Sequence, residues 1–180
     1  MDVEALQAAL LPTGEQSGHS AVVTALLRDG PRGPEVLLVL RREREGDPWS
    51  GHVALPGGNA VEGETPLETA VREAREEVGI DLPACARWLG CLPIRAPANR
   101  PGLAVIPHVA LLEAEANPSA GEEVTAVVWA PLRDLAASAF TTTRHLPHGD
   151  VTVPAFAYGG LVVWGFTHRI LTELLELLPP

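Results

Sequence analysis

The sequence predicts an α/β fold in which a mixed β-sheet lies between helices. Apolar, β-branched runs of strand length recur along most of the chain, whereas only two or three segments have helical periodicity. Strands and helices do not alternate regularly, as they would in a doubly wound sheet. At 180 residues the chain has the length of one domain, so we expect a single domain over residues 1–180.

A hairpin is expected to begin the sheet. Residues 21–27 (AVVTALL) and 35–42 (EVLLVLRR) are apolar runs joined by the turn-rich segment RDGPRGP. After a polar loop, residues 53–58 (VALPGG) indicate a short strand that a proline and two glycines interrupt. We therefore expect three strands before the first long helix.

The first long helix is predicted to begin near Pro66 and to end at Gly79. Residues 62–65 supply its start, proline is favoured in a first helical turn, and Gly79 is followed by further helix-ending residues. An apolar stripe then faces the sheet, and its members are Leu67, Ala70, Val71, Ala74 and Val78.

The second half of the chain is expected to complete the sheet and to add two helices. Apolar runs at residues 86–94, 103–112 and 123–130 indicate strands, and the segments that connect them are rich in proline, glycine and asparagine. Residues 131–138 (PLRDLAAS) suit a short helix. The apolar segment 160–178 (GLVVWGFTHRILTELLELL) predicts a closing helix.

The charge of the chain argues against several classes of protein. A formal net charge of −10 and a pI near 5.0 disfavour nucleic-acid binding, which needs a basic surface. All 13 basic residues are arginine, which excludes a Schiff-base lysine and a lysine-bearing phosphate loop. No apolar run has the length of a membrane span, and the first residues lack the pattern of a signal peptide. We expect a cytoplasmic protein with neither nucleic-acid nor membrane partners.

Three carboxylates gather along one edge of the apolar stripe of the long helix. Glu73, Glu76 and Glu77 fall within an arc of about 100°, at spacings of three and four residues. Like charges at these spacings destabilise a helix by roughly 0.2–0.5 kcal/mol per pair, and partial burial increases the penalty. A divalent cation that prefers carboxylate oxygens, such as Mg²⁺, would offset it. The alternative is an ordinary solvated acidic face.

The stretch GNAVEGETPLETAVREAREEVGI, residues 58–80, resembles the Nudix box. Every fixed position of that motif is filled in register, by Gly58, Glu64, Arg72, Glu73, Glu76, Glu77 and Gly79. The resemblance implies a Nudix-like α/β/α sandwich and the metal-dependent hydrolysis of a diphosphate. It also implies a site for Mg²⁺ or Mn²⁺, with ligands from Glu73, Glu76, Glu77 and the carbonyl of Gly57.

The same resemblance implies catalytic roles. Arg72 would orient the glutamates, and Glu76 or Glu77 would accept the proton of the attacking water. Glu123, in the segment GEEV at residues 121–124, is a further candidate because some relatives place an acidic ligand or base before a late strand. The alternative for this segment is a solvated loop.

A second resemblance concerns the substrate. The segment LVLRREREGDPWSGHVALPGG, residues 38–58, is similar to the signature of coenzyme A-hydrolysing Nudix proteins. It fits that signature at Arg42, Gly51, Pro56, Gly57 and Gly58, and it departs from it at Leu40, Glu43, Asp47 and Leu55. The resemblance implies cleavage of coenzyme A into 3′,5′-ADP and 4′-phosphopantetheine.

Coenzyme A carries a 3′-phosphate and a long pantetheine arm, so its site needs arginine and an apolar channel. We expect Arg41, Arg42 and Arg95 to bind the substrate. Trp164 and Phe166 could line such a channel, but aromatic residues at helical spacing are more often part of the core, so both are left out of the site. The alternatives are hydrolysis of ADP-ribose, NADH or a (deoxy)nucleoside triphosphate, and a Nudix-fold binding module without catalysis.

Overall fold

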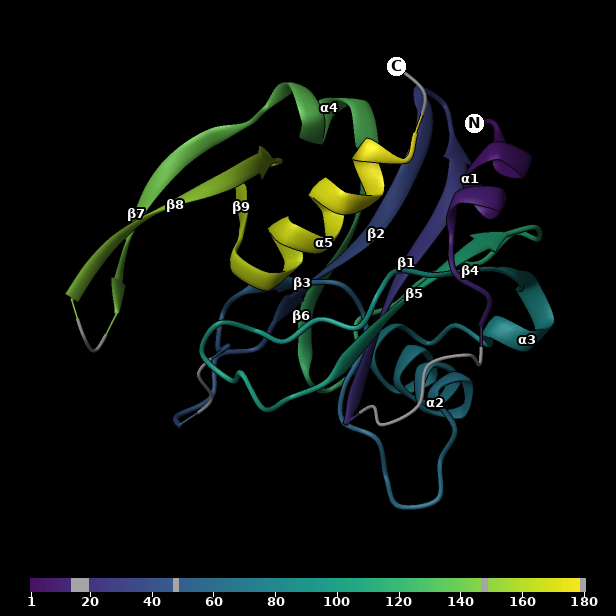
Figure 1. The fold of residues 1–180 in the computed structure, drawn as a ribbon, viewed down its shortest axis with the longest axis horizontal. Coiled ribbons are helices and arrows are strands. Elements are labelled where there is room, and N and C mark those ends of the chain that lie inside the picture. Colours follow the sequence, from purple (N-terminus) through teal and green to yellow (C-terminus); the bar gives the residue numbers. More distant parts are fainter. Residues whose placement is uncertain (14–19, 47–48, 147–148, 179–180) are drawn as a thin grey trace.

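A mixed six-stranded β-sheet forms the centre of the computed structural model (Figure 1), which describes residues 1–13, 20–46, 49–146 and 149–178. Its strands are β1 (Ala21–Gly30), β2 (Gly33–Arg41), β3 (Val53–Ala54), β4 (Ala86–Cys91), β5 (Val105–Leu112) and β6 (Val124–Pro131). The order is β3-β2-β1-β5-β4, and β6 pairs with β2. β1 and β5 are parallel, whereas the other pairs are antiparallel. These pairings confirm the predicted α/β fold with a mixed sheet.

The sheet begins with the hairpin that the sequence predicts. β1 and β2 pair from Leu27 opposite Val36 down to the turn. β3 is shorter than expected because the chain leaves β2 after Ala54 and bonds to β1 instead. The N–H of Thr24 donates to the carbonyl of Pro56 at 2.7 Å, and the N–H of Val22 donates to the carbonyl of Gly58 at 2.9 Å. The Pro-Gly-Gly turn therefore carries the chain from one strand to its neighbour.

Helices cover both faces of this sheet, as expected for an α/β/α sandwich (Figure 1). They are α1 (Val3–Ala9), α2 (Pro66–Val78), α3 (Leu82–Cys85), α4 (Leu132–Ala137) and α5 (Gly165–Glu176). Ala74 and Val78 of α2 belong to one apolar cluster with Leu37 of β2. Leu171 of α5 belongs to the other cluster with Leu38, whose side chain points to the opposite face of the strand. None of the helices in the described ranges combines the length and apolar character needed to cross a bilayer.

A second, three-stranded antiparallel sheet follows α4, and none of its strands was predicted from the sequence. It consists of β7 (Phe140–Leu146), β8 (Gly149–Tyr158) and β9 (Leu161–Trp164), in that order. The β7–β8 hairpin extends away from the rest of the molecule (Figure 1). The prediction of one closing helix over residues 160–178 is wrong in its first part, because residues 161–164 pair with β8 and α5 begins only at Gly165.

The other predicted elements are confirmed with small shifts in their ends. β4, β5, β6 and α4 lie within or next to the expected ranges, and α2 begins at Pro66 and ends before Gly79 as predicted. The short helices α1 and α3 were not expected. Each of them buries a leucine, Leu6 in α1 and Leu82 in α3, so packing stabilises elements whose local pattern is too short to be informative.

Candidate active site

The two ends of α2 fix the position of the carboxylates between them. Thr65 Oγ1 accepts a hydrogen bond from the backbone N–H of Glu68 at 3.2 Å, and Glu68 Oε2 accepts one from the N–H of Thr65 at 2.8 Å. This capping box satisfies N–H groups that a helix start leaves unpaired. At the other end Gly79 has a left-handed φ of 68°, and its N–H bonds to the carbonyls of Ala74 and Arg75.

The three glutamates of α2 lie across the boundary between core and solvent. Glu77 is only 3% exposed, Glu73 is half-buried and Glu76 is exposed. Ala74 and Val78, their neighbours on the helix, are buried against the sheet. The carboxylates therefore follow the edge of the packing face, as the helical geometry predicts.

Arg72 contacts two of these glutamates and the start of the motif. Its Nη1 lies 2.7 Å from Glu73 Oε1 and 3.1 Å from Glu76 Oε2. Its Nε donates to Glu64 Oε1 at 2.8 Å, and its Nη2 donates to the carbonyl of Asn59 at 2.9 Å. The hydrogen bond from Arg72 is the main cause that lowers the pKa of Glu64 to about 2. One guanidinium thus joins the loop before α2 to the carboxylates on it.

Glu77 is the most deeply buried of the carboxylates. Its Oε2 accepts a hydrogen bond from the N–H of Gly57 at 2.9 Å, and its Oε1 lies 3.9 Å from Arg41 Nη1. Burial raises the pKa of Glu77 to about 7, and repulsion from Glu73 and Glu123 adds to the rise, while Gly57 and Arg41 oppose it. The site therefore contains a carboxyl group that takes up a proton near neutral pH.

The Pro-Gly-Gly turn approaches α2 so closely that a side chain would not fit. A Cβ atom at Gly58 would lie 2.3 Å from Glu73 Oε1 and 2.5 Å from its carboxyl carbon. Any residue larger than glycine would therefore displace the carboxylate of Glu73. This contact explains why the motif begins with glycine at this position.

The loop before β6 brings Glu123 to the same region. The N–H of Gly121 donates to the carbonyl of Glu77 at 2.9 Å, and a Cβ atom at Gly121 would lie 2.0 Å from the carbonyl oxygen of Glu76. Burial is the main cause of the raised pKa values of Glu73 and Glu77, and the charge of Glu123 raises both further. The structure thus places Glu123 within electrostatic range of the cluster. Gly121 is not among the residues expected from the sequence.

Arg42 and Arg95, like Arg41, have partners within the protein. Arg42 Nε donates to the carbonyl of Glu122 at 2.7 Å, in the loop that carries Glu123. Arg95 Nε pairs with Glu173 Oε1 of α5 at 2.9 Å, so its contacts lie on α5 rather than on α2. Asp47, one departure from the coenzyme A signature, lies outside the described residues.

The donor atoms suit a hard divalent cation, but their side chains do not form a coordination shell. Within the described part of the chain, no three His, Cys, Asp or Glu side chains are arranged to hold a metal ion. Glu73 and Glu76 turn toward Arg72, and Glu77 turns toward Gly57. Burial raises the pKa values of Glu73 and Glu77 and repulsion between the carboxylates adds to the rise, although Arg72 opposes it at Glu73 and Gly57 and Arg41 oppose it at Glu77; the positive charge in the site therefore does not fully offset the carboxylates. Carboxylate oxygens with uncompensated charge are typical ligands of Mg²⁺ and Mn²⁺.

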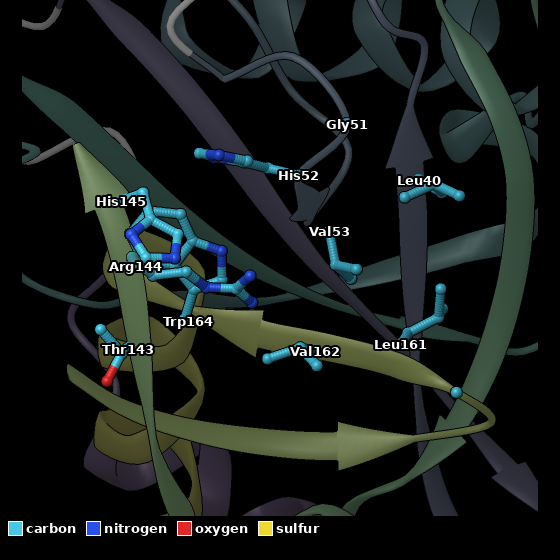
Figure 2. Close-up of a pocket in the computed structure, with 11 residues that line it drawn as sticks. Leu40, Gly51, His52, Val53, Thr143, Arg144, His145, Leu161, Val162 and Trp164 are labelled. Atoms are coloured by element: carbon cyan, nitrogen blue, oxygen red, sulfur yellow. The ribbon is translucent and has the colours of Figure 1, made fainter. Parts of the chain in front are cut away.

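A cavity of about 480 Å³ opens where β2 and β3 meet the second sheet (Figure 2). The apolar side chains of Leu40, Val53 and Val162 line one side. The side chains of Arg144, Trp164 and His52 line the other. The Arg144 guanidinium carbon lies 5.0 Å from the centroid of the Trp164 ring. Neither Arg144 nor Trp164 is among the site residues expected from the sequence, because the strands β7 and β9 were not predicted. The β-branched runs TTT at residues 141–143 and VTV at residues 151–153, with a proline and a glycine between them, are the signal that would have indicated strands there.

The comparison of this chain with protein families agrees with the motif. A model of the NUDIX domain matches residues 18–149. The chain belongs to the Nudix family. Among solved structures, a Nudix hydrolase from M. smegmatis, RenU, aligns with this Nudix protein with a TM-score of 0.55 at 21% identity, over 71% of this chain and 81% of the other, and so shares its fold.

Two relatives of this Nudix protein have names that include a substrate. The human mitochondrial coenzyme A diphosphatase NUDT8 is 31% identical over 151 residues, which are 82% of this chain and 64% of the human protein. The peroxisomal coenzyme A diphosphatase ndx-8 of Caenorhabditis elegans is 36% identical over 126 residues, which are 68% of this chain and 53% of that protein. The matches thus span less than two thirds of the length of either relative.

Proposed function

We propose that this Nudix protein hydrolyses the diphosphate of coenzyme A or its derivatives and releases 3′,5′-ADP and 4′-phosphopantetheine. The observation that carries the proposal is the similarity to two coenzyme A diphosphatases, at 31% and 36% identity. The similarity extends well beyond the box, because the match to the human protein covers 82% of the chain. We infer that one domain over residues 1–180 performs the reaction on a small-molecule substrate. The cytoplasmic location stays a prediction, since the two relatives are named mitochondrial and peroxisomal.

The proposed metal site consists of Glu73, Glu76, Glu77 and the carbonyl of Gly57. Bound Mg²⁺ or Mn²⁺ would neutralise the diphosphate and stabilise the charge that develops during in-line displacement at phosphorus. Arg72 holds Glu73 and Glu76 in place through its contacts at 2.7 and 3.1 Å. Glu77 must release the proton that it binds below about pH 7 before it can act as a ligand.

A carboxylate of the site accepts the proton of the attacking water in the proposed reaction. The candidates are Glu76 and Glu77 in the box and Glu123 in the loop before β6. Water reaches Glu76 directly because its side chain is exposed, whereas Glu77 is buried. The water oxygen bonds to one phosphorus, the bond from that phosphorus to the bridging oxygen breaks, and the bridging oxygen leaves on the other phosphate.

Arg41, Arg42 and Arg95 stay the proposed substrate-binding residues. The position of Arg41 supports its role, because its guanidinium lies 3.9 Å from Glu77 and guanidinium groups suit phosphate. For Arg42 and Arg95, substrate binding would compete with the contacts to Glu122 and Glu173.

A second candidate function is hydrolysis of another nucleoside diphosphate derivative, such as ADP-ribose, NADH or a (deoxy)nucleoside triphosphate. The departures from the coenzyme A signature favour it. Leu40 lines the cavity and Leu55 is buried in the core, so both departures lie in packed positions rather than on the free surface. The third alternative, a binding module without catalysis, is disfavoured because every carboxylate of the box is present.

Product analysis distinguishes these functions. The full-length protein is incubated with Mg²⁺ or Mn²⁺ and, separately, with coenzyme A, NADH, ADP-ribose and nucleoside triphosphates, and the products are separated by chromatography. Release of 3′,5′-ADP from coenzyme A with the highest kcat/KM supports the proposal. A higher kcat/KM for another diphosphate supports the second candidate, and no cleavage with either metal supports the binding module.

A further inference from the structure

The cavity between the two sheets combines a cation with apolar walls (Figure 2). The guanidinium of Arg144 stacks over the ring of Trp164, and the His52 and Trp164 rings form an edge-to-face contact with centroids 4.6 Å apart. Leu40 and Val53 line the apolar side. The volume of about 480 Å³ is in the range of small-molecule sites. This lining suits a ligand that has both a planar ring and a negative charge.

Arg144 has no carboxylate partner among the residues that the structure describes. Other arginines do, for example Arg28 with Glu35 at 2.7 Å. Asp150, on the strand that pairs with β7, is engaged by His145 instead. The Nε of Arg144 is buried and also lacks a hydrogen-bond partner within the described ranges. A half-buried guanidinium without an anion is unfavourable, and a bound phosphate would satisfy it.

Arg41 connects the cavity to the proposed metal site. Its backbone N–H donates to the carbonyl of His52, which lines the cavity, at 3.0 Å, and its Nη1 lies 3.9 Å from Glu77 Oε1. Leu40, the preceding residue, lines the cavity. Arg41 therefore links the two regions at the end of β2, through its backbone to a residue of the cavity lining and through its guanidinium to Glu77.

We propose that Arg144 binds the 3′-phosphate of the substrate and that the cavity holds the adenosine that carries this phosphate. The inference rests on the proposed function, because the 3′-phosphate distinguishes coenzyme A from most nucleoside diphosphates. The phosphate takes the place of the carboxylate that Arg144 lacks, and the adenine packs against Trp164 and Leu40. The pantetheine arm is uncharged and would leave the guanidinium unpaired, so it lies outside this cavity.

Equilibrium binding tests the inference without turnover. The full-length protein in EDTA is titrated by calorimetry with 3′,5′-ADP and with 5′-AMP, which differ only in the 3′-phosphate. The wild type should prefer 3′,5′-ADP, and Arg144→Ala should reduce this preference by about 10- to 100-fold, the range of a charge-assisted contact. Arg133→Ala is the matched control, since the side chain of Arg133 on α4 is 62% exposed and does not line the cavity. An unchanged preference in Arg144→Ala would overturn the inference.

Kinetics on the same variants separates this inference from the proposed function. Arg144→Ala should lower kcat/KM for coenzyme A and leave kcat/KM for 3′-dephospho-coenzyme A nearly unchanged. Equal losses on both substrates would remove the role of Arg144, although coenzyme A would still be the best substrate of the wild type. A wild type that prefers another diphosphate would overturn the proposed function. In that case, the cavity assignment would still be supported if the wild type and Arg133→Ala bound 3′,5′-ADP more tightly than 5′-AMP and Arg144→Ala did not.

Discussion

Replacing Glu77 by glutamine should stabilise the metal-free protein above neutral pH. Glutamine keeps an oxygen that can accept the hydrogen bond from the N–H of Gly57, but it removes the buried charge. Glu77 is 3% exposed, and burial is the main cause that raises its pKa from 4.5 to about 7. The wild type must ionise this group inside the protein, whereas the variant has nothing to ionise there.

The size of the effect follows from the shift in pKa. A rise from 4.5 to about 7 is about 2.5 units, or about 3 kcal/mol in the free energy of unfolding. Because the folded-state pKa is raised, this stability is fully present below the unfolded pKa near 4.5 and is lost as the pH rises through about 7. The wild type should lose up to about 3 kcal/mol over this window through Glu77, and Glu77→Gln should lose none of it. Burial also raises the pKa of Glu73, so the unfolding free energy of Glu77→Gln still falls somewhat as the pH rises.

Urea denaturation in EDTA at several pH values between about 5 and 8 measures this difference. Glu62→Gln is the control, because Glu62 is exposed in the loop before α2 and its variant should follow the wild type. The reasoning would be refuted if the unfolding free energies of wild type and Glu77→Gln ran parallel over the whole range. Parallel curves would mean that the folded protein carries no uncompensated charge at Glu77.

Three further predictions concern the same helix. Glu76→Gln should lower turnover by orders of magnitude and leave the urea midpoint unchanged, because the side chain is exposed and belongs to the proposed metal site rather than to the core. Near-normal turnover would contradict its role as a metal ligand. Mg²⁺ should raise the Tm, measured by calorimetry, more at pH 8 than at pH 6. The reason is that protons compete with the metal for Glu77 and Glu73, whose pKa values are raised. Equal increases in Tm at both pH values would count against the metal site. Thr65→Ala should lower the free energy of unfolding by about 1 kcal/mol, because it removes the N-cap hydrogen bond. Urea denaturation measures the difference, with Thr65→Ser, which keeps the hydroxyl oxygen, as the control. Equal stabilities of the two variants would show that the cap contributes nothing.

The helix and its carboxylates were predictable because the information is local. The N-cap, the proline of the first turn and Gly79 fix the ends of α2, and the spacing of Glu73, Glu76 and Glu77 fixes their common edge. The same reasoning could not find the contacts of Gly121, since they depend on a loop that returns to α2 from more than forty residues further along the chain. Tertiary packing, rather than the pattern around Gly121, explains that glycine.

The second sheet escaped prediction for a related reason. Leu161–Trp164 continues into the apolar pattern of α5, and only pairing with β8, from Ala155 opposite Trp164 to Tyr158 opposite Leu161, makes it a strand. β8 itself is exposed over most of its first half, so the hydrophobic alternation that identifies a half-buried strand is weak there. Strand pairing outweighs the helical pattern of the sequence at this point.

Chemistry and substrate recognition are assigned to different parts of the chain. The proposed metal ligands and Arg72 lie within residues 57–77 and contact one another over short separations in sequence. The cavity is lined by Leu40 and residues 51–53 on one side and by residues 143–145, 160–162 and 164 on the other, which meet where β9 packs against β3. A substitution at Arg144 can therefore change which diphosphate is bound without moving the glutamates of α2. For this reason the box predicts the reaction class from sequence alone, whereas discrimination between coenzyme A and its 3′-dephospho form should depend on Arg144, outside the box.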